Sequence, residues 1–95
     1  MPNLREHFLV GDRVRISDSY HWAKNTLGTV KKPEANEWLE GYEKGCSREV
    51  ESLRGMLTFY WVEFDEPQTD ADGDGPYSEA EIESEFLVHL TDNTN

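Results

Sequence analysis

The chain has 95 residues and a formal net charge of −11, because twenty Asp and Glu residues outnumber nine Lys and Arg residues. A chain of this length builds one hydrophobic core, so we expect a single domain over residues 1–95. The negative charge repels phosphate backbones and anionic lipid, and the sequence therefore predicts binding neither to nucleic acid nor to a membrane surface.

The first third of the chain predicts two strands separated by a loop. Residues 7–16 alternate between apolar and polar side chains around a break at Gly11-Asp12, which indicates one strand or two strands joined by a kink. Residues 17–25 are rich in Ser, Asp and Asn and predict a long loop. A short strand then begins at Gly28 and ends before Pro33.

Residues 33–55 predict a partly helical insertion into the domain. Three large apolar residues lie at helical spacing in it, namely Trp38, Leu39 and Tyr42. Ser47 stands where it would cap a helical turn that contains Val50 and Leu53.

Residues 56–64 form the most β-prone segment, and both of its faces are apolar. One face carries Leu57, Phe59 and Trp61, and the other carries Thr58, Tyr60, Val62 and Phe64. A strand at the surface of a small barrel needs only one buried face. The second face is therefore covered by the insertion, by the ends of the chain, or by a second copy in a homo-oligomer.

After Pro67, residues 68–81 form an acidic loop with the spacing of a calcium-binding loop. Carboxylates stand at positions one, three and five, Gly75 at position six and a glutamate at position twelve. The predicted calcium ligands are the carboxylates of Asp70, Asp72, Asp74 and Glu81, the carbonyl of Pro76, and Ser78 directly or through water. The alternative is a solvated Asp-Gly turn, because a strand and not a helix leads into this loop.

The last part of the chain predicts a helical turn followed by a strand. Ser78 and Glu81 form a capping-box pair at the start of a turn that extends through Ser84. The alternation of Phe86, Val88 and Leu90 with Leu87 and His89 predicts the final strand. Residues 91–95 form a polar tail.

Four or five short strands with one brief helical turn before the last favour a mainly β fold, a small SH3-like antiparallel barrel. Three stretches resemble bacterial SH3-like barrels, namely residues 11–16, residues 21–23 leading to 28–30, and residues 61–67. Their layout is similar to the variable chain of ferredoxin-thioredoxin reductase and to KOW-type modules. The resemblance implies a β framework and no catalytic residue, and the chain lacks the basic surface that KOW modules use on RNA.

Two groups of aromatic and aliphatic residues are candidates for binding a partner. Tyr20, His21 and Trp22 are typical of a peptide-groove wall in the first long loop of such folds. Alternatively, Trp22 fixes the loop on the barrel and leaves Tyr20 and His21 facing a partner. The second group is the apolar face formed by Leu57, Phe59 and Trp61.

Nothing in the sequence predicts an enzyme, because no Ser or Cys motif accompanies the three histidines. Cys46 is the only cysteine, and no apolar run approaches a membrane span or a signal peptide, so we expect a soluble cytoplasmic protein. We interpret the chain as a non-enzymatic protein-interaction or regulatory module whose partner is a protein. A basic partner protein would fit the negative net charge of the chain. The alternatives are a calcium-binding domain and an acidic inhibitor, of the immunity or nucleic-acid-mimic kind.

Overall fold

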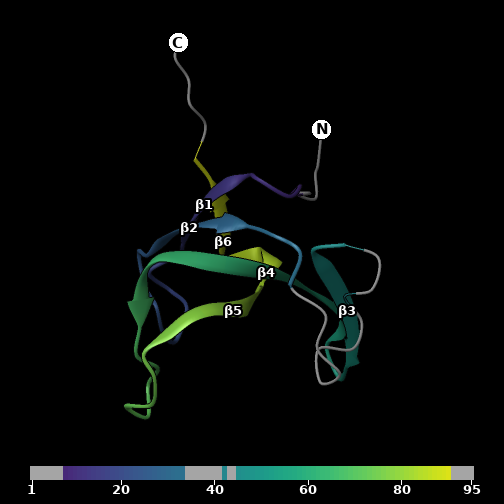
Figure 1. Ribbon diagram of the computed structural model, residues 1–95. Coiled ribbons are helices and arrows are strands. Elements are labelled where there is room, and N and C mark those ends of the chain that lie inside the picture. Colours follow the sequence, from purple (N-terminus) through teal and green to yellow (C-terminus); the bar gives the residue numbers. More distant parts are fainter. Residues whose placement is uncertain (1–7, 34–41, 43–44, 91–95) are drawn as a thin grey trace.

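The computed structural model describes residues 8–33, 42 and 45–90. Its elements are the strands β1 (Arg13–Ile16), β2 (Leu27–Val30), β3 (Ser47–Ser52), β4 (Gly55–Gln68), β5 (Tyr77–Glu83) and β6 (Leu87–His89), and the 3-10 turn η1 (Ser84–Phe86). The strands form one antiparallel sheet in the order β3-β4-β2-β1-β6, and β5 pairs with the opposite side of β4. The sheet curls into a half-barrel around the long β4 (Figure 1). The expected mainly β fold, with one short helical turn before the last strand, is confirmed in the part of the chain described.

The core lies on the inner face of this curled sheet. Its fully buried side chains are Val14, Ile16, Val30, Val62 and Ile82, which come from β1, β2, β4 and β5. Along β4, Tyr60, Val62 and Phe64 are buried, as the alternation of that segment predicts. The outer face of the same strand carries Leu57, Phe59 and Trp61, which are only partly buried. The described residues include no helix of the length and apolarity that a bilayer crossing requires.

The first predicted strand is shorter than expected. Only Arg13–Ile16 is extended, while the backbone N–H of Asp12 donates to the carbonyl of Leu9 at 2.9 Å and closes a turn. Gly11 takes a φ of 99°, a conformation that side chains disfavour and glycine permits. As a result Val10 is 62% exposed instead of sharing the buried face with Phe8.

The helical turn predicted at Ser47 is wrong, because this segment forms β3 and pairs with β4 as a hairpin. Ser52 Oγ accepts a hydrogen bond from the backbone N–H of Arg54 at 3.1 Å, and Gly55 has a φ of 105°. A left-handed glycine at this position closes a tight hairpin. Ser52 therefore stabilises the turn between the two strands, whereas Ser47, the predicted helix cap, is the first residue of β3. Trp38 and Leu39 of the predicted helical insertion lie outside the described residues.

The helical turn predicted from Ser78 to Ser84 is also wrong, because residues 77–83 form β5. Glutamates alternate with Ala80 and Ile82 along this strand, and Ile82 points into the core. The two-residue period and the pairing with β4 prevail over the capping-box pattern. The helical turn begins only at Ser84 and includes Phe86, which was expected in the last strand.

Pro67 does not end β4 but lies where the β4–β5 register shifts, a position that tolerates proline.

Candidate functional site

Glu81 lies at the centre of an ion-pair network on the outer face of the sheet. Arg48 donates from Nε to Oε1 and from Nη2 to Oε2 of Glu81, each at 2.8 Å, and the Tyr42 hydroxyl donates to Oε1 at 2.8 Å. The hydrogen bonds from Arg48 lower the pKa of Glu81 below its ordinary value. Burial, followed by the hydrogen bond to Glu81, raises the pKa of Tyr42. Glu81 is therefore an ionised structural partner of Arg48.

The same network covers part of the apolar outer face of β4. The ring of Tyr42 meets that of Trp61 edge-on, with 5.7 Å between centroids, and the Arg48 guanidinium lies 5.7 Å from the centre of the Phe59 ring. Trp61 Nε1 donates to Glu79 Oε1 at 2.7 Å. Of the three covers proposed for this face, the insertion thus contributes at least Tyr42.

The structure does not bring the predicted calcium ligands together. Asp70 Oδ1 accepts hydrogen bonds from the backbone N–H groups of Asp72 and Asp74, both at 2.9 Å, and so stabilises the turn. Pro76 and Ser78 are exposed, and Glu81 is held by Arg48 further along β5. Within residues 8–33, 42 and 45–90, no three His, Cys, Asp or Glu side chains are arranged to hold a metal ion.

The aromatic loop packs against the sheet. Tyr20 is only 5% exposed, and its ring lies 4.8 Å from that of Phe86. The prediction that Tyr20 faces a partner is therefore wrong, because the half-barrel uses this side chain in its core. The ring of Trp22 meets Phe64 edge-on at 5.7 Å, which agrees with the alternative in which Trp22 fixes the loop. His21 remains exposed.

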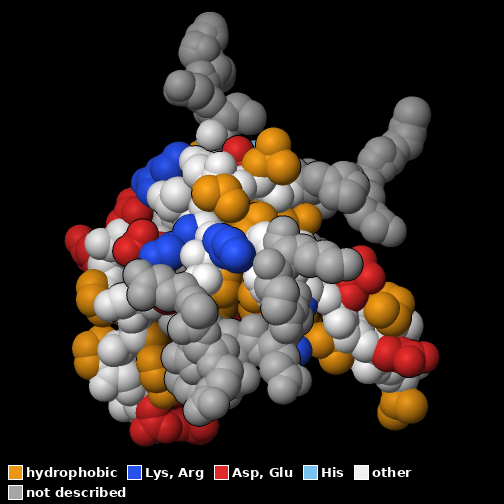
Figure 2. Space-filling model, turned by 45° about the vertical axis from the view of Figure 1, so that its right-hand side comes forward, with side chains coloured by type: hydrophobic (Ala, Val, Ile, Leu, Met, Phe, Trp, Pro, Cys, Tyr) orange, Lys and Arg blue, Asp and Glu red, His pale blue; other side chains and the backbone are white. Residues whose placement is uncertain are grey.

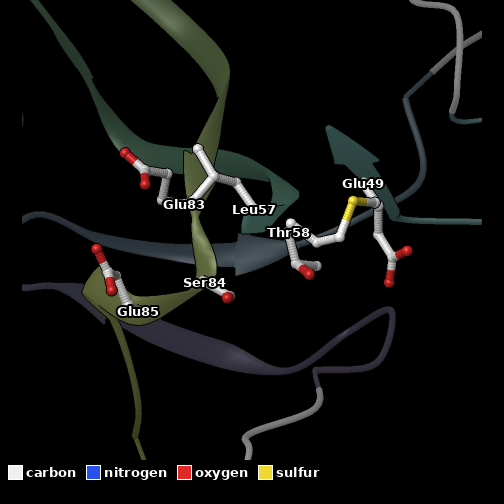
Figure 3. Close-up of a pocket in the computed structure, with 7 residues that line it drawn as sticks. Glu49, Leu57, Thr58, Glu83, Ser84 and Glu85 are labelled. Carbon is white, nitrogen blue, oxygen red and sulfur yellow. The ribbon is translucent and has the colours of Figure 1, made fainter. Parts of the chain in front are cut away.

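A hollow of about 360 Å³ lies between the β3–β4 hairpin and the chain that leaves β5 (Figure 3). Its lining consists of Glu49, Met56, Leu57 and Thr58 from the hairpin and Glu83, Ser84 and Glu85 from the end of β5 and from η1. Hydrophobic and acidic side chains stand next to one another over this hairpin in the space-filling view (Figure 2). Leu57 is the one lining residue that the sequence predicted to bind a partner. The sequence did not predict the strand β3, so it gave no reason to place Glu49 beside Leu57.

Glu83 brings a poorly satisfied carboxylate to the hollow. Its side chain is 17% exposed, and its buried Oε2 atom has no hydrogen-bond partner among the residues described. Its ion-pair partner is Arg54, whose Nη2 lies 3.6 Å from Oε2, too far for a good hydrogen bond. A buried carboxylate oxygen gains free energy from a closer donor. The hollow therefore favours a positively charged group.

No protein-family model matches the chain, and neither a curated protein nor a solved structure matches it. The resemblance to SH3-like barrels therefore stays a prediction.

Proposed function

We propose that this chain is a non-enzymatic protein-interaction module that binds a positively charged segment of a partner protein in the hollow. The observation that carries the proposal is the presence of three carboxylates and two accessible aliphatic side chains in one concavity. Met56 is 59% exposed there, although large apolar side chains gain free energy from burial. A segment that combines Lys or Arg with aliphatic residues would satisfy both kinds of group.

The distribution of ion pairs supports a basic partner. Several cations of the chain are already neutralised internally, as in the pairs Arg13–Asp65 and Arg48–Glu81. Glu49 and Glu85 form no ion pair within the part of the chain that the structure describes. The net charge of −11 adds a long-range field that attracts cationic segments. Both the carboxylates at the hollow and the net charge of the whole chain thus favour binding of a positively charged segment.

The test measures fluorescence anisotropy with a labelled short peptide of alternating Lys and Val, and with a Glu and Val peptide as the negative probe. The double variant Glu49→Gln with Glu85→Gln removes two rim charges. We expect it to weaken binding about five- to thirtyfold, which corresponds to about 0.5–1 kcal/mol for each lost charge pair.

The matched control is Asp72→Asn with Asp74→Asn, which changes the net charge by the same amount in the exposed β4–β5 turn. We expect the control to bind within about twofold of the parent. Equal weakening by the two double variants would mean that only overall charge matters and would contradict the site. Failure of the Lys and Val peptide to bind at about 1 mM, near the weak end of measurable affinity, would contradict the function.

A further inference from the structure

Among the residues that the structure describes, no strand pairs with one side of β4 at the hollow. β3 pairs with β4 from Gly55 to Tyr60, whereas β5 pairs with it from Phe59 to Glu63 and again at Gln68. Within the described ranges 8–33, 42 and 45–90, residues 55–58 therefore have a strand on one side only. An unpaired strand edge presents backbone donors and acceptors to any extended segment that approaches it.

The backbone groups that face this open side belong to Met56 and Thr58. Trp61 donates its N–H to the carbonyl of Cys46 at 2.9 Å and accepts from the N–H of Lys31 at 3.0 Å, both on the β3 and β2 side. Backbone groups alternate between the two sides of an antiparallel strand. Tyr60, Thr58 and Met56 therefore face the other side, where Ile82 of β5 lies opposite Tyr60.

The chain leaves the line of β5 just where the next pair would form. The register that places Ile82 opposite Tyr60 would place Ser84 opposite Thr58, but β5 ends at Glu83 and η1 begins at Ser84. In the described part of the chain, no backbone hydrogen bond joins η1 to Met56 or Thr58. The hollow occupies the space beside these residues, as Figure 3 shows for the side chains around it.

We propose that the partner segment binds as an added β-strand that pairs with the backbone of Met56 and Thr58. This proposal rests on the proposed function and adds the mode of binding. The basic side chains of the segment pair with the carboxylates of Glu49, Glu83 and Glu85, and its aliphatic side chains cover Met56 and Leu57. A second copy of the chain is a poor occupant, because it carries a charge of −11 and would bring its own carboxylates to the hollow.

The peptide probe tests this mode on the side of the ligand. The Lys and Val peptide is compared with the same peptide methylated on its backbone amides, which keeps its charge but removes its hydrogen-bond donors. Strand addition predicts that methylation weakens binding about tenfold or more. Equal binding of the two peptides would overturn strand addition and leave the proposed function standing, whereas absence of binding by both would overturn both proposals.

Thr58→Pro tests the mode on the side of the protein. It removes an N–H that faces the hollow and not β3, so the β3–β4 ladder is kept. We expect binding about five- to tenfold weaker than in the matched variant Thr58→Val, which retains the N–H.

Hydrogen exchange of the parent protein gives a readout that does not depend on the folding of a variant. The peptide is expected to slow exchange at the amides of Met56 and Thr58. Bound peptide without this protection would overturn strand addition. If the same amides become protected without peptide, and more so as the protein concentration rises, the occupant of this edge is a second copy of the chain and not a basic segment.

Discussion

Gly28 gives the sharpest test of the packing that holds the half-barrel together. It lies in β2 opposite Phe64 of β4. A Cβ atom at this position would lie 2.6 Å from the carbonyl oxygen of Glu63 and 2.7 Å from Cγ1 of Val62. The carbonyl belongs to the neighbouring strand, so it cannot move away without disturbing the β2–β4 ladder. Gly28→Ala therefore forces the two strands apart at a place where the core is fully buried.

The expected cost follows from this geometry. Overpacking a well-packed core typically costs about 1–3 kcal/mol, and contact with backbone places Gly28→Ala at about 2–3 kcal/mol. For a domain of this size, about 4–8 °C of Tm is lost per kcal/mol, so we expect Tm to fall by roughly 10–20 °C. Thermal unfolding followed by circular dichroism, together with urea unfolding, measures both quantities.

Gly45→Ala is the matched control, because it is the same substitution at a glycine with open space around it. Apart from Gly45 and its chain neighbours, no described residue has an atom within 4 Å of a Cβ at this position, and its φ lies outside the left-handed region. We expect its stability to stay within about 0.5 kcal/mol of the parent or to rise slightly, since alanine restricts the unfolded chain. If Gly28→Ala melts within a few degrees of Gly45→Ala, the packing argument is refuted.

Two further predictions concern Glu81. Its folded-state pKa is lowered below the ordinary value of 4.5, so its ion pair with Arg48 stabilises the fold at neutral pH and is lost as the pH falls through the lowered pKa. Arg48→Met should therefore cost about 1 kcal/mol at pH 7 and less near pH 3 in urea unfolding, whereas Arg54→Met, the control, should cost less at both. If Arg48→Met lowers the free energy of unfolding equally at pH 7 and near pH 3, the ion pair with Glu81 does not stabilise the fold as argued. Millimolar calcium should leave Tm within about 2 °C of its value in chelator, because Glu81 is engaged by Arg48. A calcium-specific rise of roughly 10–20 °C, absent with magnesium, would instead show that Glu81 and the acidic turn rearrange into the predicted ion site.

Local alternation was sufficient to identify the central strands and the class of fold. The period-two pattern of residues 56–64 predicted that Tyr60, Val62 and Phe64 share a face, and these three side chains are buried together. This information is local because successive side chains of any strand point to opposite faces. A short helical turn before the last strand was predicted as well, but over residues 78–84, whereas the observed turn spans Ser84–Phe86.

The two glutamate-rich segments could not be assigned from their own residues. Residues 47–52 and 77–83 combine alternation with serines that are typical of helix starts, and both are strands. Both are stabilised by pairing with β4 on its opposite sides, which a local pattern does not contain. Strand preference depends on such cross-strand neighbours more than on intrinsic propensity.

The candidate sites show the same division between local and long-range information. By itself, the sequence determined the acidic composition, the β class and the carboxylate spacing of the Asp70 turn, because each of these is a property of neighbouring residues. Only the tertiary structure decided that Glu81 pairs with Arg48, 33 positions away, and that Glu49 and Glu85 border one hollow. A carboxylate interacts with the charges nearest to it in space, and in a sheet these are set by which strands pair and in which register.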